Sequence, residues 1–266
     1  MNVAIRNLLR LIRAGVFDSH EDAEPMSVWK WRRVYEIAVE QGVVRHTLAG
    51  INRLNGQFFL NIPDSMIDDW KKSCYEYQED DTQQVCLTNR RNLRRFERIA
   101  EKGGQNPHTM ELLVASINLA HHIIADGLFL PSLLHLATAI RKKETVDADL
   151  YIKWVDQLHM ERILPLENCM LKLLFNSSET FLPSSPTDDD IARAEDIFDR
   201  LFSKNHAHSG QLHFTQNGND IFVHTSNSRA MLWQARRSAQ FFRYYPSEGI
   251  SSLIQSFKHS LTDIEE

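Results

Sequence analysis

Histidine and aspartate side chains that could bind a metal or move protons gather in residues 119–140, LAHHIIADGLFLPSLLHLATAI. On a helix through this stretch, His122 and Asp126 lie one turn apart on the same face, and His121 lies about 100° away. With His135 after the next turn, these four residues form a candidate polar pocket. One interpretation is a metal-dependent hydrolase or transferase, although zinc needs three or four ligands. The interpretation we favour is structural, because a last-turn histidine interacts well with free helix carbonyls.

A second group of residues is basic. The run NRRNLRRFERIAEK places its cations on one helical stripe, with Arg91 and Arg95 beside it: Arg90, Arg94, Arg98 and Lys102. One interpretation is an anion-binding face for phosphate or nucleic acid. The interpretation we favour is that these cations stabilise the C-terminal end of a helix, because periodicity predicts one long helix over 64–102. Its early aspartates and late cations would then complement the helix dipole.

Two aspartate pairs have the spacing that holds Mg²⁺ in transferases when it follows a strand, namely Asp147/Asp149 and Asp188/Asp190. Each pair precedes a helical pattern, so we interpret both as helix caps and first-turn acids. The sequence contains no GxGxxG, GxxxxGK[ST], GxSxG or HExxH motif. We therefore assign no catalytic residue, no metal and no cofactor.

The elements that would position these residues are almost all helices. Periodicity predicts helices over 2–16, 27–41, 43–53, 64–102, 108–126, 130–143, 147–158, 160–176, 187–203, 227–243 and 246–260. In residues 210–225, GQLHFTQNGNDIFVHT, alternating apolar residues flank Asn217-Gly218 and predict a β-hairpin. The expected fold is mainly α, a bundle-like array of helices with one small hairpin. We expect its core to contain Trp29 or Trp31, Trp70, Trp154 and Trp233.

Composition is typical of a soluble globular protein, with 266 residues that are 42% hydrophobic and 24% charged. A formal charge of −5 gives no general reason to bind nucleic acid or a membrane. Three cysteines without a CxxC indicate reduced thiols in a cytoplasmic protein. The turn at 103–107 divides the chain into N-terminal (1–105) and C-terminal (106–266) helical regions, or joins them in one continuous domain.

Several stretches together resemble a family of uncharacterised bacterial nucleotidyltransferases. The opening segments IRNLLRLIRAGVF and WKWRRVYEIAVEQGVVRHTLAGINRL resemble the start of that family. The matching landmarks are Trp31, Ala38, Gln41, Gly42, Val43 and Ile62-Pro63. In the middle, His121 or His122 matches a family histidine, and Gly127 and Leu130 match the motif that follows it. Near the end, the landmarks are Trp233, Arg236, Tyr245-Pro246 and Glu248.

The departure from that family lies between Lys102 and His108, where the family carries its α/β catalytic domain and this chain has only GGQNP. The family's polar Arg, Gln and Asp fall at Pro131, Ser132 and His135. The resemblance therefore implies a related helical framework without metal-binding carboxylates. We expect a non-catalytic binding or regulatory protein whose partner is another protein. The alternatives are the metal-dependent enzyme built on the polar pocket, and a nucleic-acid-associated module built on the basic stripe.

Overall fold

The computed structural model describes residues 3–55, 60–76, 84–125, 130–141, 146–201 and 239–262, without the side chains of 76, 200, 201 and 256–262. These residues are mainly helical, as periodicity predicts, and none of them forms a strand. The helices are α1 (Val3–Phe17), α2 (Val28–Glu40), α3 (Val44–Asn55), α4 (Asp64–Glu76), α5 (Arg90–Gly103), α6 (Pro107–Ala125), α7 (Leu130–Arg141), α8 (Ala148–Leu158), α9 (Leu164–Phe175), α10 (Asp188–Leu201) and α12 (Pro246–Thr262). The predicted hairpin at 210–225, most of the predicted helix at 227–243, and Trp233 lie outside the described residues.

The prediction of one long helix over 64–102 is wrong. α4 ends at Glu76, and residues 84–89 are not helical before α5 begins at Arg90. The two helices bury their apolar faces in different places: Trp70 of α4 packs near Tyr35 of α2, whereas α5 packs on α6 and α8. Asn89 instead caps the start of α5, because its side chain accepts from the N–H groups of Arg91 and Asn92.

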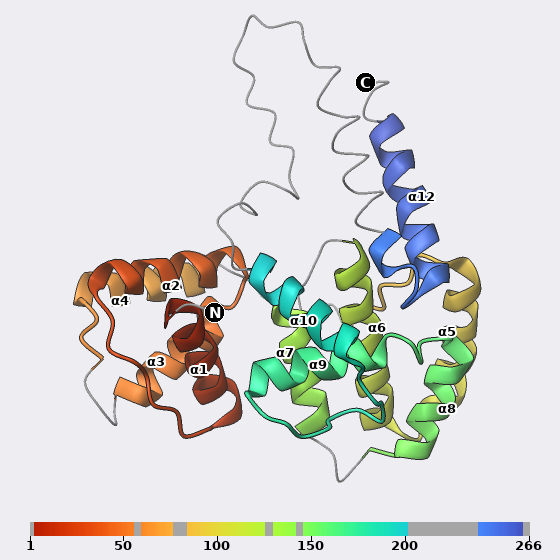
Figure 1. The fold of residues 1–266 in the computed structure, drawn as a ribbon, viewed down its shortest axis with the longest axis horizontal. Coiled ribbons are helices and arrows are strands. Elements are labelled where there is room, and N and C mark those ends of the chain that lie inside the picture. Colours follow the sequence, from red (N-terminus) through yellow and green to blue (C-terminus); the bar gives the residue numbers. More distant parts are fainter. Residues whose placement is uncertain are drawn as a thin grey trace, which may run out of the picture.

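α1 is the centre of an N-terminal group of helices. It is buried along most of its length and packs on α2 and α3, while α4 packs on both of these (Figure 1). The α1 and α3 backbones approach closely, because a Cβ atom added to Gly50 would lie 2.6 Å from the carbonyl carbon of Leu11. Glycine at this position therefore permits the packing of the two helices.

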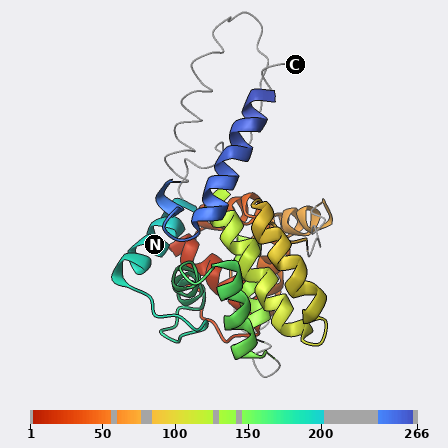
Figure 2. The same cartoon turned by 90° about the vertical axis from the view of Figure 1, so that its right-hand side faces the viewer.

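α6 is the centre of a second group. α5, α7, α8, α9 and α12 all pack on it, and α10 packs on α9. α12 begins against this group and then extends away from it, as Figure 2 shows. The two groups meet where α1 packs on α9: Arg13 Nη1 donates to the carbonyl oxygen of Leu174 at 2.8 Å. The predicted division near residue 105 falls in the turn between α5 and α6, and it stays a prediction.

The core contains three of the expected tryptophans. Trp31, Trp70 and Trp154 are buried, with at most 5% of each exposed, which confirms the prediction for them. Trp29 is 67% exposed, so of the two alternatives Trp31 is the core residue. Among the described helices, none is both long and apolar enough to cross a membrane.

Candidate functional site

The predicted polar pocket is described only in part. His121 and His122 are half-buried near the end of α6, and their ring centroids lie 5.7 Å apart in an edge-to-face arrangement. Asp126 lies outside the described residues, so the four-residue pocket stays a prediction. His135 lies on α7 and lines a pocket whose other walls come from α5 and the first half of α6. Within the part of the chain that is described, no three His, Cys, Asp or Glu side chains gather as a metal site would require.

Both aspartate pairs stand at helix starts, as we predicted. Asp147 is the N-cap of α8, and its side chain accepts a hydrogen bond from the Leu150 N–H at 3.0 Å. Asp190, in the first turn of α10, accepts hydrogen bonds from the Thr187 N–H at 2.9 Å and from the Tyr244 hydroxyl at 3.0 Å. Burial raises the pKa of Asp190, but these hydrogen bonds outweigh burial and hold the pKa below its usual range.

The start of α5 is fixed by two acceptors. Asn89 is the N-cap, and its side chain accepts from the N–H groups of Arg91 and Asn92 at 2.9 and 3.2 Å. The carboxylate of Glu248, in the first turn of α12, accepts from the Thr88 N–H at 2.8 Å and the Thr88 hydroxyl at 2.6 Å. It also accepts from the Asn89 N–H at 3.2 Å. The Asn89 N–H, which helix geometry leaves unpaired, is therefore satisfied by a helix about 160 residues away.

Asn92 ties the same two helices together from inside. Its side-chain amide is buried and donates to Glu248 at 3.0 Å, to the Ser247 hydroxyl at 2.8 Å and to the Tyr245 hydroxyl at 3.1 Å. Tyr245 in turn donates to the carbonyl oxygen of Leu158 at the end of α8. This network of buried polar groups holds the start of α5 against α8 and α12.

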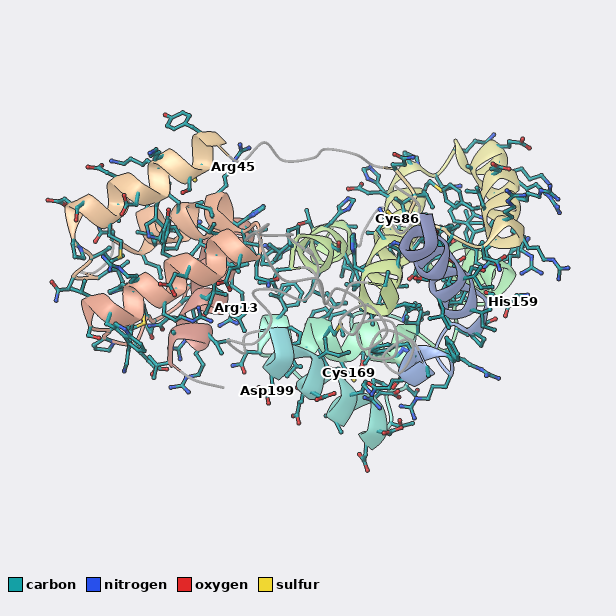
Figure 3. All side chains as sticks on the ribbon, turned by 90° about the horizontal axis from the view of Figure 1, so that it is seen from above. Arg13, Arg45, Cys86, His159, Cys169 and Asp199 are labelled. Atoms are coloured by element: carbon teal, nitrogen blue, oxygen red, sulfur yellow. The ribbon has the colours of Figure 1, made fainter. Side chains whose placement is uncertain are left out.

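The predicted basic stripe lies on one exposed side of α5. We call it the basic face, and it consists of Arg90, Arg91, Arg94, Arg98 and Lys102. None of these five side chains forms an ion pair or hydrogen bond with another described residue. In Figure 3, seen from above, the nitrogen-bearing side chains of α5 point outward, away from the other helices. Arg95 beside them is half-buried and donates to the side chain of Asn92.

Seven arginines elsewhere in the described residues are paired with carboxylates. Six of them lie on α1, α2, α3 and α10, and the seventh, Arg243, lies shortly before α12. The pairs are Arg6 and Arg10 with Glu24, Arg13 with Glu21, Arg33 with Glu36, Arg53 with Asp18, Arg193 with Asp196, and Arg243 with Asp189. Contact with Arg6 and Arg10 lowers the pKa of Glu24 to about 2. The five cations of the basic face differ from these seven arginines, because none of the five has a carboxylate partner among the described residues.

The end of α5 and the turn after it form one wall of a pocket of about 380 Å³. The lining residues are Ala100, Gly103, Gly104, Pro107, Met110, Glu111, Val114 and His135. Gly103 is buried against the Trp154 ring, and a Cβ atom there would lie 3.2 Å from that ring. Gly104 is different, because a Cβ atom there would have nothing within 4 Å. The sequence flagged this turn and His135 separately, and the structure brings them together.

Sequence reasoning missed a buried acid, Glu167 of α9. It has no exposed surface, and neither carboxyl oxygen makes a hydrogen bond of acceptable geometry to a described residue. Burial raises the pKa of Glu167 well above its usual range, and the nearby Ser116 hydroxyl offsets part of that effect. Ser116 and the Tyr151 hydroxyl are 2.8 Å apart, so α6, α8 and α9 share this polar cluster. The available signal was an acid inside the apolar helix LPLENCMLKLLF.

No family model, no curated protein and no solved structure matches this chain. The described residues define a mainly helical protein with an outward basic face on α5 and a pocket at the junction of α5, α6 and α7.

Proposed function

We propose that this chain is a non-catalytic helical binding protein whose basic face holds an acidic segment of another protein. The observation that carries the proposal is the position of the cations on a helix that begins at Arg90. In a single helix over 64–102 they would lie at the C-terminal end, where the dipole favours them. In α5, Arg90 and Arg91 occupy the first turn, where the dipole disfavours each cation by about 0.3–1 kcal/mol, and of the basic face only Lys102 lies in the last turn.

Helix stability therefore does not account for the basic face. An anionic occupant does, because it would neutralise cations that have no carboxylate partner among the described residues. The stripe from Arg90 to Lys102 is roughly 18 Å long at about 1.5 Å per residue, which matches a short peptide segment. The helix is held at both ends, by Asn89 and Glu248 at its start and by Trp154 at its end, so its backbone loses little conformational freedom on binding.

An acidic protein segment fits this face better than a nucleic acid does. The chain carries a net charge of −5, which repels a long polyanion beyond the contact itself. The only aromatic residue between 90 and 102 is Phe96, which is half-buried against the core and does not offer a stacking surface. Guanidinium groups bind carboxylates in a bidentate geometry, so a segment rich in Asp and Glu supplies the matching chemistry.

The resemblance to bacterial nucleotidyltransferases supports the non-catalytic part of this proposal. The turn Gly104–Asn106 joins α5 directly to α6, at the point where that family carries its catalytic domain. Asp147 and Asp149 have a spacing that can hold Mg²⁺, but here Asp147 caps α8 and Asp149 lies in its first turn. We expect no pyrophosphate release with any of the four ribonucleoside triphosphates and Mg²⁺ or Mn²⁺. Turnover that disappears in Asp149→Asn would contradict this expectation.

The binding proposal is tested by fluorescence anisotropy with a labelled ten-residue peptide of alternating Asp and Glu. The double variant Arg94→Glu/Arg98→Glu replaces two attractions with two repulsions. Each lost attraction and each added repulsion should change the binding free energy by about 0.3–0.5 kcal/mol, so we expect about a tenfold loss of affinity. The matched control is Arg32→Glu/Lys72→Glu, which makes the same charge change on exposed positions of α2 and α4.

The control variant should keep the wild-type affinity, and added salt should weaken binding to the wild type. An equal loss in both double variants would refute the assignment of this face, because the effect would then come from net charge alone. A labelled 20-nucleotide single-stranded DNA or RNA is titrated in parallel. Tighter binding of either nucleic acid than of the peptide would overturn the choice of partner.

A further inference from the structure

One side of α12 carries an apolar stripe. Ile250 and Ile254 lie one turn apart on this helix and are 49% and 50% exposed. The sequence continues the stripe through Phe257 and Leu261, at intervals of four, three and four residues. At about 100° per residue, these four positions lie within about 60° of one another around the helix. We call these four residues the α12 seam.

The seam lies opposite the surface that attaches α12 to the other helices. α12 packs on α6, and its buried residues Glu248 and Ser252 lie about 150–170° around the helix from the middle of the seam. The chain enters α12 on a third side, because a Cβ atom added to Gly249 would lie 2.7 Å from the ring of Phe242. α12 then extends away from the described helices (Figure 1, Figure 2). The described part of the chain therefore leaves the seam open to a partner.

The spacing of the seam indicates what kind of partner fits it. A narrow apolar stripe with intervals of three and four residues is the pattern of a coiled-coil contact between two helices. Serine, glutamine, lysine and histidine fill most other positions of α12, with Leu253 beside the seam. The partner is therefore a helix with a matching narrow stripe, because the side chains of each stripe fit between those of the other.

The charge of α12 favours a partner that is identical to it. A symmetric pair brings the same surface of both copies together, so charged flanks would repel each other. Among the α12 side chains that the structure describes, only Glu248 is charged, and it is buried against the start of α5. Ser247, Ser251 and Leu253 beside the seam are uncharged. A helix with charged flanks would find no opposite charge there, whereas a second copy brings the same neutral flanks.

We propose that two copies of this chain pair through the α12 seam, as a short coiled coil of two α12 helices. From Ile250 to Leu261 the contact is about 17 Å long, at about 1.5 Å per residue. A contact this short is at the low end of specific interfaces, so we expect a weak dimer with a Kd of about 10–100 µM. The seam shares no residue with the basic face, so this proposal is independent of the acidic-segment proposal.

Sedimentation velocity of the full chain tests the pairing. Between about 1 and about 200 µM, the average mass of the wild type should rise from one chain toward two chains. Ile254→Glu places one carboxylate from each copy in the seam and should raise the Kd at least about tenfold. The matched control is Gln255→Glu, which makes the same charge change at an exposed position about 100° around the same helix. This control should keep the self-association of the wild type.

A second variant, Ile250→Ser/Ile254→Ser, removes apolar surface without adding charge and should also raise the Kd at least about tenfold. Circular dichroism of each variant establishes that it is folded. A wild type that stays at one chain up to about 200 µM would overturn the proposal and leave the seam to another segment of this chain or to a different protein. A mass above two chains would overturn pairing in twos. A dimer that persists in the serine variant, or is lost equally in Gln255→Glu, would show that pairing does not use the seam.

Discussion

Glu248 is the residue whose removal tests how the start of α5 is held. Glu248 is 2% exposed, and its carboxylate accepts hydrogen bonds from four donor groups of residues 88–92, at distances of 2.6–3.2 Å. Glu248→Ala leaves the Thr88 and Asn89 N–H groups without this acceptor, at a place where water reaches them only in part. The Asn92 amide keeps its hydrogen bonds to Ser247 and Tyr245.

The expected loss follows from these contacts. Removal of a cap costs about 0.5–2 kcal/mol, and a hydrogen bond to a charged group contributes about 1.5–3 kcal/mol. The contributions overlap, and partial solvation replaces some of them, so we expect a net loss of about 2–4 kcal/mol in the free energy of unfolding. At about 2–4 °C per kcal/mol for a chain near this size, the melting temperature should fall by roughly 4–16 °C.

Urea unfolding followed by circular dichroism measures this loss, with Glu97→Ala as a control on the exposed side of the same helix. The control should stay within about 0.5 kcal/mol of the wild type. In the anisotropy assay, Glu248→Ala should also weaken binding of the acidic peptide, although it removes none of the basic face. If Glu248→Ala and Glu97→Ala have the same stability, Glu248 does not hold α5 and the preorganisation argument fails.

Three further predictions concern the core. Gly50→Ala should lower the free energy of unfolding by about 2 kcal/mol, measured with urea, because the new methyl group overlaps the Leu11 backbone. The control Gly104→Ala should be neutral or slightly stabilising. Equal effects of the two variants would refute the close approach of α1 and α3. Trp154→Ala should cost about 3–5 kcal/mol, and a change under about 1 kcal/mol would mean that the ring is not packed. The folded-state pKa of Glu167 is raised, so its stabilising contribution is complete below the unfolded pKa of about 4.3 and declines as pH rises through the folded value. Glu167→Gln should therefore be less sensitive to pH between 4 and 8.5 and gain on the wild type at high pH; parallel curves would contradict this.

Most helices could be predicted because their apolar periodicity is local. The predicted 2–16, 108–126 and 147–158 match α1, α6 and α8 to within one residue at each end. Local periodicity could not show that residues 64–102 form two helices. α4 and α5 are each amphipathic, and they differ in the helices on which they pack. A local signal for the break did exist: Asn89 precedes the basic run and is a favoured N-cap residue.

The candidate sites were predictable to different degrees. Spacing alone placed Arg90, Arg94, Arg98 and Lys102 on one face, because that is a property of one helix. Spacing could not show that Glu248 caps this helix, since the contact joins residues about 160 positions apart. The same limit applies to the pocket, whose lining residues come from three helices and from the turn between two of them.

The arrangement of charge on α5 is unfavourable for an isolated helix. Along Arg90, Arg94, Arg98 and Lys102, each i, i+4 neighbour is another cation, and each such pair destabilises a helix by about 0.2–0.5 kcal/mol. Glu97, three residues after Arg94, forms no ion pair with it within the described structure. A helix whose sequence served only its own stability would alternate these charges. In α5 the charges are separated, and contacts from α8 and α12 offset the cost. We expect an occupant of opposite charge on the basic face to offset the rest of this cost, as the proposed function requires.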